Sequence, residues 1–143
     1  MSLLDIRGQI TFLYFDDMPA AFDFFENVLE LPLISEQNGD QTQTSPWTRI
    51  YQTSTTTFIG AVDHRTGSVK ATYRDGVLNS LVIKNFDEMA KRLEAKGIEF
   101  TVKPFYFEEQ QIKTMMFYGP EGYLFEVEEF MSPEDRAAFY GEA

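Results

Sequence analysis

The sequence contains no cysteine and only one histidine, His64, among its 143 residues. Without thiol groups the chain cannot form disulfides, thiolate zinc sites or iron–sulfur clusters, and it has no cysteine nucleophile. A single imidazole also excludes a metal site built from several histidines of one chain. These absences exclude several classes of metalloprotein and thiol enzyme before any motif is considered.

Basic residues and long apolar runs are also scarce. Lys and Arg number 12 against 23 Asp and Glu, which gives a net charge of −11 and a pI near 4.4. Such a surface repels phosphate backbones, so we expect no nucleic-acid partner. No stretch approaches the roughly 18 consecutive apolar residues of a membrane helix, and Met1–Gln9 lacks the apolar segment of a signal peptide. We therefore expect a cytoplasmic protein with no membrane partner.

Aromatic residues, in contrast, are abundant. They make up 15% of the chain, with 14 Phe and 7 Tyr. The hydrophobic content of 43% and the charged content of 24% are typical of a globular protein, and the length suits one domain. A core of this size does not need so many rings, so the surplus indicates an aromatic-lined cavity.

The order of predicted elements repeats in the two halves of the chain. Asp16–Asp17 and Asn85 are N-cap candidates that each start a helix after a strand, and Gly97 suits the end of the second helix. Apolar runs and turn signals predict strands at 9–15, from 31–34 onward, at 47–52, 56–62, 77–83, 98–102, 112–118 and 123–129. Asn85 lies 68 positions after Asp17, and Leu124 lies 66 positions after Phe58. This near-constant offset predicts a duplicated β-α-β-β-β unit, the alternative being an unrelated α+β fold with a coincidental rhythm.

The predicted fold class is therefore α+β, in a single domain. Module one spans about residues 8–63, a polar connector 64–76, and module two about 77–130. Asn38-Gly39-Asp40 indicates a turn. Ser132-Pro-Glu-Asp135 is a capping box with proline in the first helical turn, which predicts a short C-terminal helix over about 132–140.

Two segments resemble motifs of a known superfamily. Asp17-Met-Pro-Ala-Ala-Phe-Asp-Phe-Phe-Glu-Asn-Val-Leu-Glu-Leu-Pro-Leu33 resembles the first-helix signature of the vicinal oxygen chelate superfamily, which contains glyoxalase I, bleomycin-resistance proteins and extradiol dioxygenases. Gly119-Pro-Glu-Gly-Tyr-Leu-Phe-Glu-Val127 resembles its closing turn and strand, D-P-x-G-x-x-x-E. The resemblance covers about residues 9–129 and implies two βαβββ modules whose mixed sheet curls around a central cup. Relatives commonly pair, so it also implies a homodimer.

The chain departs from these motifs at two positions. Gly119 replaces the usual Asp of the closing turn. Glu30 replaces the usual Gly after the first helix, so that helix must end without the residue best suited to a left-handed cap.

The resemblance also identifies the positions that hold a metal in metal-dependent relatives. Four inward positions on the first and last strands of the modules supply His, Gln or Glu ligands there, and they correspond to Ile10, Gly60, Leu78 and Glu126 of this chain. Only Glu126 carries a donor atom, and one carboxylate cannot hold a catalytic divalent ion, which generally needs three protein ligands. A slip of one residue would bring in only Thr11 and Asn79, which are weak ligands. We therefore expect no metal site of the family type and no cofactor.

The period of two in strands predicts which side chains face the cup. The opposite faces should pack as core, through Leu13, Phe15, Leu81, Ile83, Phe125 and Val127. Val62, Val82, Thr114 and Leu124 should join the lining, and a stacking platform at its rim would add residues of the third strand. The candidate ligand-binding set is Ile10, Phe12, Tyr14, Trp47, Arg49, Phe58, Gly60, Leu78, Ser80, Met116, Tyr118 and Glu126. A small-molecule pocket that is apolar with few polar groups fits this set.

Several residues keep two interpretations. Glu126 is either a desolvated base or counter-charge for a cationic ligand, or a carboxylate that is solvated or paired with Arg49. Trp47, Arg49 and Tyr51 form either the stacking platform or ordinary cross-strand packing. We expect Glu128 and Glu129 to be solvated and His64 to be an exposed loop residue. The aromatic segment 105–109 is an edge strand, a loop over the cup or a dimer contact.

Two functions remain open from the sequence. The first is a metal-independent binding protein similar to bleomycin-resistance members, holding an apolar-aromatic ligand, neutral or cationic, in the cup. The second is an enzyme that uses Glu126 as a catalytic general base, with Tyr14 or Tyr118, for an isomerase or lyase step or a dioxygenase-like reaction.

Overall fold

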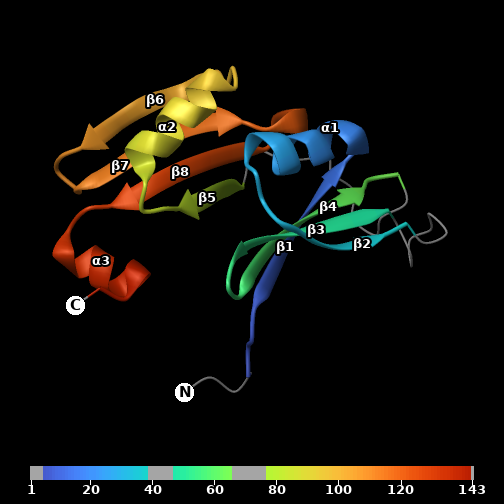
Figure 1. Ribbon diagram of the computed structural model, residues 1–143, viewed down its shortest axis with the longest axis horizontal. Coiled ribbons are helices and arrows are strands. Elements are labelled where there is room, and N and C mark those ends of the chain that lie inside the picture. Colours follow the sequence, from blue (N-terminus) through green and yellow to red (C-terminus); the bar gives the residue numbers. More distant parts are fainter. Residues whose placement is uncertain (1–4, 39–46, 66–76, 143) are drawn as a thin grey trace. The chain divides into compact units, whose positions relative to one another are not determined.

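The structure is a computed structural model that describes residues 5–38, 47–65 and 77–142. It forms two compact units, Met1–Tyr73 and Arg74–Ala143, each with its own sheet (Figure 1). The predicted turn residues Gly39 and Asp40, and connector residues 66–76, lie outside the described residues.

The described residues of unit 1 form four strands and one helical segment between the first two strands. Its sheet has the order β1-β4-β3-β2, with β1 parallel to β4 and the other neighbours antiparallel. The elements are β1 (Gln9–Phe15), α1 (Met18–Asp23), the π-helical turn η1 (Phe24–Val28), β2 (Leu33–Gln37), β3 (Thr48–Ser54) and β4 (Thr57–Asp63).

Unit 2 repeats this arrangement. Its sheet has the order β5-β8-β7-β6, and again only the first pair is parallel. The elements are β5 (Leu78–Val82), α2 (Phe86–Ala95), β6 (Phe100–Phe107), β7 (Ile112–Tyr118), the short helical turn η2 (Pro120–Gly122), β8 (Leu124–Phe130) and α3 (Pro133–Tyr140). The α+β class and the duplicated βαβββ module are therefore confirmed, while the central cup stays a prediction.

The first helix starts as its sequence predicts and ends in a way that it does not. Asp17 Oδ1 accepts a hydrogen bond of 3.0 Å from the Ala20 amide, and Pro19 lies in the first turn. The helix then widens, because the Leu29 amide bonds to the Phe24 carbonyl five residues back. Glu30 follows with φ of 55°, so a non-glycine residue takes the left-handed conformation at this helix end.

In the second module the predicted cap at Gly97 is confirmed, and Asn85 is confirmed as the N-cap residue without a capping bond from its side chain. Gly97 has φ of 84°, and the Ile98 amide bonds to the Leu93 carbonyl at 3.1 Å, which is a Schellman ending. Asn85 occupies the N-cap position of α2, but its side chain makes no capping bond. The carboxylate of Glu129 caps the helix instead, accepting from the Phe86 amide at 3.1 Å.

The helices cover one face of each sheet. In unit 1, Phe25 of η1 packs edge-on against Phe15 and stacks on Tyr51. In unit 2, α2 contacts β7 and β8, beneath which Phe117 and Phe125 are fully buried. Leu13, Phe15, Phe125 and Val127 are buried as predicted, whereas Leu81 and Ile83 are half-buried. The other face of each sheet carries the side chains of the candidate site.

No helix within the described residues combines the length and apolar character needed to cross a membrane. The cytoplasmic location stays a prediction of the sequence.

Candidate functional site

The sheet register of unit 2 brings the predicted site residues of that module together on one face. Ser80 of β5 and Met116 of β7 flank Glu126 of β8 as direct cross-strand neighbours. Leu78 and Tyr118 are the cross-strand neighbours of Leu124, which precedes Glu126 by two residues on the same face of β8. Leu78 is 46% and Tyr118 55% exposed, so apolar and aromatic surface surrounds the carboxylate.

Glu126 has a partner that the sequence analysis missed. Glu128 lies two residues along β8, on the same face, and the two carboxyl groups are joined by a hydrogen bond. Thr114 Oγ1 donates to Glu126 Oε2 at 2.8 Å, and Ser80 Oγ donates to Glu128 Oε2 at 3.0 Å. The prediction that Glu128 is simply solvated is therefore wrong, because it is half-buried and belongs to a carboxyl pair.

The pKa values of Glu126 and Glu128 shift in opposite directions. Burial raises the pKa of Glu128 to about 7, helped by the hydrogen bond and charge of Glu126 and opposed by the bond from Ser80. Burial also acts against the charge on Glu126, but hydrogen bonds from Glu128, Thr114 and Ser80 outweigh it and lower the pKa of Glu126. Near pH 6 the pair therefore holds one carboxylate, on Glu126, and one carboxylic acid, on Glu128.

In unit 1 the corresponding face is apolar. The register of β1 and β4 places Ile10 beside Phe58, Phe12 beside Gly60 and Tyr14 beside Val62. Ile10 and Phe12 are each 42% exposed. This face therefore groups Ile10, Phe12, Tyr14, Phe58 and Gly60, as the sequence pattern predicts.

Phe12 fills the space above Gly60. A Cβ built on Gly60 would lie 2.6 Å from Phe12 Cδ1 and 2.8 Å from its Cε1, distances that side-chain carbons do not adopt. Gly60, which the family resemblance implies to be a ligand position, therefore has no donor, and a larger side chain has no room there while the ring stays in place.

The residues present do not fit a divalent metal of the family type. Ile10 and Leu78 are hydrocarbon, Gly60 is covered by a ring, and Glu126 is already bonded to Thr114 and Glu128. Across the stretches 5–38, 47–65 and 77–142, no three side chains among His, Asp and Glu gather as a metal-binding group. A lone carboxylate does not supply the three protein ligands that such sites generally need.

Trp47 and Arg49 lie apart from this face. Arg49 stacks over the Phe22 ring of α1 at 3.9 Å and forms ion pairs of 2.6 Å with Glu26 and Glu36. Trp47 packs edge-on against the same ring, with centroids 5.0 Å apart. Cross-strand and helix packing therefore explains both side chains, and the structure separates them from the rest of the candidate ligand set.

The ion pairs with Glu26 and Glu36 stabilise the charged form of Arg49. Burial opposes the charge of Arg49, but its hydrogen bonds with Glu36 and Glu26 outweigh it and raise the pKa of Arg49. Arg49 therefore pairs with Glu26 and Glu36 of its own unit, in place of the pairing with Glu126 that was one of the two sequence interpretations. His64 is half-buried, with Nε2 4.0 Å from Asp16 Oδ1.

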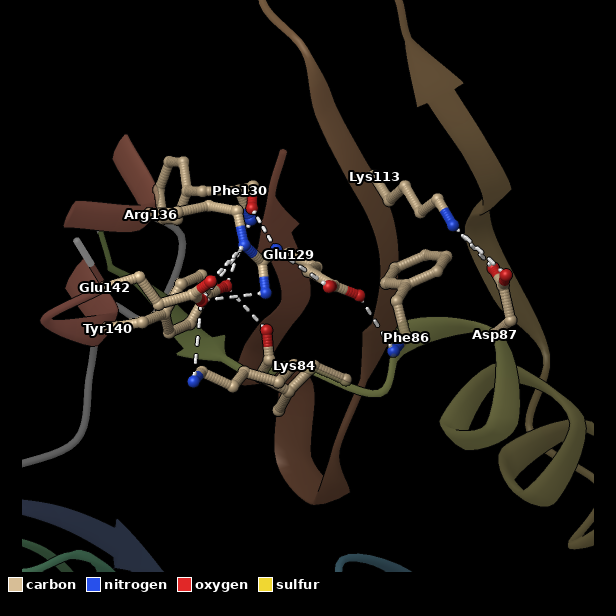
Figure 2. A network of polar contacts seen from close by, with 10 residues as sticks. Lys84, Phe86, Asp87, Lys113, Glu129, Phe130, Arg136, Tyr140 and Glu142 are labelled. Carbon is tan, nitrogen blue, oxygen red and sulfur yellow. Dashed lines mark hydrogen bonds and ion pairs between the residues drawn. The ribbon is translucent and has the colours of Figure 1, made fainter. Parts of the chain in front are cut away.

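Glu129 is also not solvated, contrary to the sequence prediction. It is 7% exposed and links two helices, since Oε1 caps α2 and Oε2 accepts from Arg136 Nη1 of α3 at 3.1 Å (Figure 2). The available signal was strand alternation, which places Glu129 on the core face with Phe125 and Val127.

The C-terminal helix is held at the end of β8 by two further contacts. Arg136 pairs with Glu142 at 2.9 Å. The Tyr140 hydroxyl donates to the Ile83 carbonyl at 2.6 Å and accepts from the Phe130 amide at 3.0 Å, so it lies between β5 and β8 where their ladder ends (Figure 2).

A sequence model of the Glyoxalase/Bleomycin resistance protein/Dioxygenase superfamily matches residues 8–127, most of both units. The chain belongs to this superfamily. The glyoxalase-like motifs around Asp17 and Gly119 thus reflect true membership. No curated protein matches the chain.

Solved structures of the same superfamily share the fold. Lactoylglutathione lyase from Agrobacterium tumefaciens is 19% identical with a TM-score of 0.67, covering 84% of this chain and 90% of its own. A glyoxalase/bleomycin resistance protein/dioxygenase from Nocardioides is 20% identical with a TM-score of 0.68, covering 93% and 87%. The fosfomycin resistance protein FosX from Listeria monocytogenes, complexed with Mn(II) and sulfate, is 18% identical with a TM-score of 0.65, covering 94% and 98%.

Proposed function

We propose that this superfamily member is a metal-independent small-molecule binding protein. The observation that supports the proposal most directly is the Phe12 ring above Gly60, because an aromatic surface stands where relatives place a metal ligand. Ile10 and Leu78 add exposed hydrocarbon at two further ligand positions. The site is therefore suited to contact by stacking and burial rather than by coordination.

The ligand that suits these groups is flat, largely apolar and either neutral or cationic. Exposed Phe12 and Tyr118 offer ring faces, which attract planar rings and cations. The ionised Glu126 offers one negative charge in apolar surroundings, and the net charge of −11 attracts cations and repels anions. The expected homodimer also belongs to this proposal.

A pair of isosteric probes tests the proposal. N-methylquinolinium and 1-methylnaphthalene have the same shape and differ in charge, and their binding is measured by titration calorimetry on protein dialysed against EDTA. We expect saturable binding of both, with the cation bound about tenfold more tightly, as expected for roughly 1.4 kcal/mol. The Glu126→Gln variant should lose the preference for the cation, whereas Tyr118→Ala, which removes an exposed ring on the same face of the unit 2 sheet, should weaken both probes.

A separate measurement tests whether ligand binding depends on a metal ion. Adding Mn²⁺ or Zn²⁺ back to the dialysed protein should leave both affinities unchanged. Binding that appears only after metal is added, or a stoichiometric divalent ion in protein purified without chelator, contradicts the proposal.

A second candidate function is catalysis by the carboxyl pair. The observation in its favour is the pKa of Glu128, which is raised to about 7 beside an ionised Glu126. In such an enzyme the Glu126 carboxylate takes a proton from the substrate and the Glu128 acid returns one to the product, as in an isomerisation. Glu126→Gln should then lower turnover on an identified substrate at least a hundredfold while neutral ligands still bind, and full turnover in that variant dismisses the role.

A further inference from the structure

The face of the unit 2 sheet that carries Glu126 ends in a row of apolar side chains. Phe107 of the edge strand β6 lies opposite Ile112 of β7, and Ile112 lies opposite Phe130 of β8. Phe130 follows Glu126 by four residues, and side chains at even spacing along a strand share a face. The row therefore lies on the Glu126 face, about 13 Å further along β8 than Glu126 itself.

The C-terminal helix α3 adds a further ring to this row. Phe139 stacks on Phe130, with ring centroids 4.1 Å apart and ring planes inclined by 4°, yet it is 55% exposed. The helix is held from the other side of β8, where Arg136 pairs with Glu129 at 3.1 Å. Figure 2 shows Glu129 pointing toward α2 and Phe130 pointing to the opposite side of β8. Polar contacts elsewhere on α3 therefore fix the position of a ring that keeps much of its own surface exposed.

This aromatic end is continuous with the surroundings of the carboxyl pair. Phe105 lies beside Thr114, whose hydroxyl donates to Glu126, and its ring meets that of Phe107 edge-on at 6.0 Å. Phe105 is 44% and Phe107 36% exposed, so these rings, like Phe139, offer apolar surface to solvent. Exposed apolar surface that borders a few polar groups is typical of a surface that binds a small molecule.

Helix α3 lies outside the part of the chain that matches the superfamily. The match ends at residue 127, and α3 begins at Pro133. Phe139 therefore adds aromatic surface beside the sheet without belonging to either four-stranded module. A side chain placed in this way can change which ligand is bound and leave the shared fold unaltered, because the backbone that carries it does not build the sheet.

We propose that Phe139, together with Phe130 and Phe107, forms an aromatic subsite that binds a second ring of the ligand. This inference rests on the proposed function and narrows its ligand class to aromatic cations that carry a second ring on a linker. The linker must span about 7–13 Å, the distance along β8 from Phe130 back to Glu128 and to Glu126. Contact with the exposed rings adds stacking and apolar burial, so Phe139 determines which aromatic cations bind most tightly.

Two quinolinium probes test the subsite by titration calorimetry. N-(5-phenylpentyl)quinolinium and N-pentylquinolinium share the cation and the linker and differ in the terminal ring. In the unaltered chain the terminal ring should raise the affinity about fivefold or more. Phe139→Ala and Phe139→Leu should lose most of this gain, whereas Phe139→Tyr should retain it because tyrosine keeps the ring. Circular dichroism melts check that each variant is folded, and the leucine variant keeps apolar volume on α3 if alanine loosens the helix.

Tyr106→Ala is the matched control, because it removes a ring that is 47% exposed on the helix-covered face, beside Lys113. It should leave the gain from the terminal ring unchanged, and N-methylquinolinium, which is too short to reach Phe139, should bind all variants alike. A terminal ring that adds no affinity in the unaltered chain, or adds as much in the folded Phe139 variants, overturns the inference while the proposed function stands. Failure of N-methylquinolinium itself to bind contradicts the proposed function and removes this inference with it.

Discussion

The Phe12 ring occupies the space that a side chain at position 60 would need. Substitutions at these two positions therefore test whether the ring is what excludes a side chain there. We expect Gly60→Ala to lower the free energy of unfolding by about 1–3 kcal/mol, because the new methyl group meets the ring at 2.6 Å. Urea denaturation measures the change. In a Phe12→Ala background the same substitution should have little effect, and equal effects in both backgrounds would show that the ring is not the obstacle.

The raised pKa of Glu128 makes the free energy of unfolding depend on pH in a direction that can be worked out. Its pKa is about 7 in the folded chain against an ordinary value of 4.5, so between these values the folded state holds a proton that the unfolded state has lost. The free energy of unfolding should therefore fall as pH rises from about 4.5 to 7, by about 1 kcal/mol once solvent screening of a half-buried group is discounted. The lowered pKa of Glu126 acts below this window, where stability is lost as pH falls.

Urea titrations at pH 5, 6 and 7.5 measure this effect. Glu128→Gln cannot lose a proton and should flatten the profile across the window. Glu126→Gln should flatten it in part, since Glu128 then loses the neighbouring charge that holds its proton. Parallel profiles for the unaltered chain and Glu128→Gln would rule out a shared proton.

The helices α2 and α3 are joined through Glu129, which makes their docking depend on Arg136. Arg136→Met leaves a 7% exposed carboxylate without its cation and should lower the free energy of unfolding by about 2–4 kcal/mol. Lys84→Met removes an exposed ion pair of 3.4 Å with Glu142 and serves as the control, with an expected loss under about 1 kcal/mol. Denaturant unfolding compares them, and equal losses would mean that Glu129 is not the reason α3 docks.

Most elements of the fold follow from local signals. Asp17 and Ser132 accept the amide bonds that their motifs predict, and the strands at 9–15 and 112–118 have the predicted bounds. The π-helical turn after Asp23 does not follow, because the Leu29–Phe24 bond depends on how Phe24 and Phe25 both reach the core. Tertiary packing, which no local pattern contains, selects it.

The candidate site follows from sequence as far as strand alternation extends. Alternation groups Ser80, Met116 and Glu126, but the bonded carboxyl pair depends on which hydroxyl groups lie across the strands. Alternation alone does not tell which face of the sheet Trp47 and Arg49 occupy, because that depends on the pairing of β3 with β4, which sets Arg49 beside buried Ala61 on the helix-covered face. Register is a property of paired strands, and one strand's sequence does not contain it.

At the scale of the molecule, both units carry the same sign of charge. Residues 1–73 contain 9 acidic and 4 basic residues, and residues 74–143 contain 14 and 8. Such a chain repels itself in the folded state, and the repulsion weakens as salt shortens the Debye length from about 30 Å at 0.01 M to about 10 Å at 0.1 M. We expect the melting temperature to rise when NaCl increases from 10 to 100 mM. KCl should act equally, and a rise with sulfate but not chloride would indicate exclusion of the salt from the surface instead.

The Tyr140 hydroxyl between Ile83 and Phe130 has a consequence for amide exchange. Most β8 amides are protected by the sheet, whereas the Phe130 amide is protected by a side chain of α3. Its exchange with deuterium therefore requires only that the C-terminal helix lift away, not that the strands separate. A Phe130 amide that exchanges faster than those of Phe125 and Val127, and faster still in Tyr140→Phe, would report the opening of this helix directly.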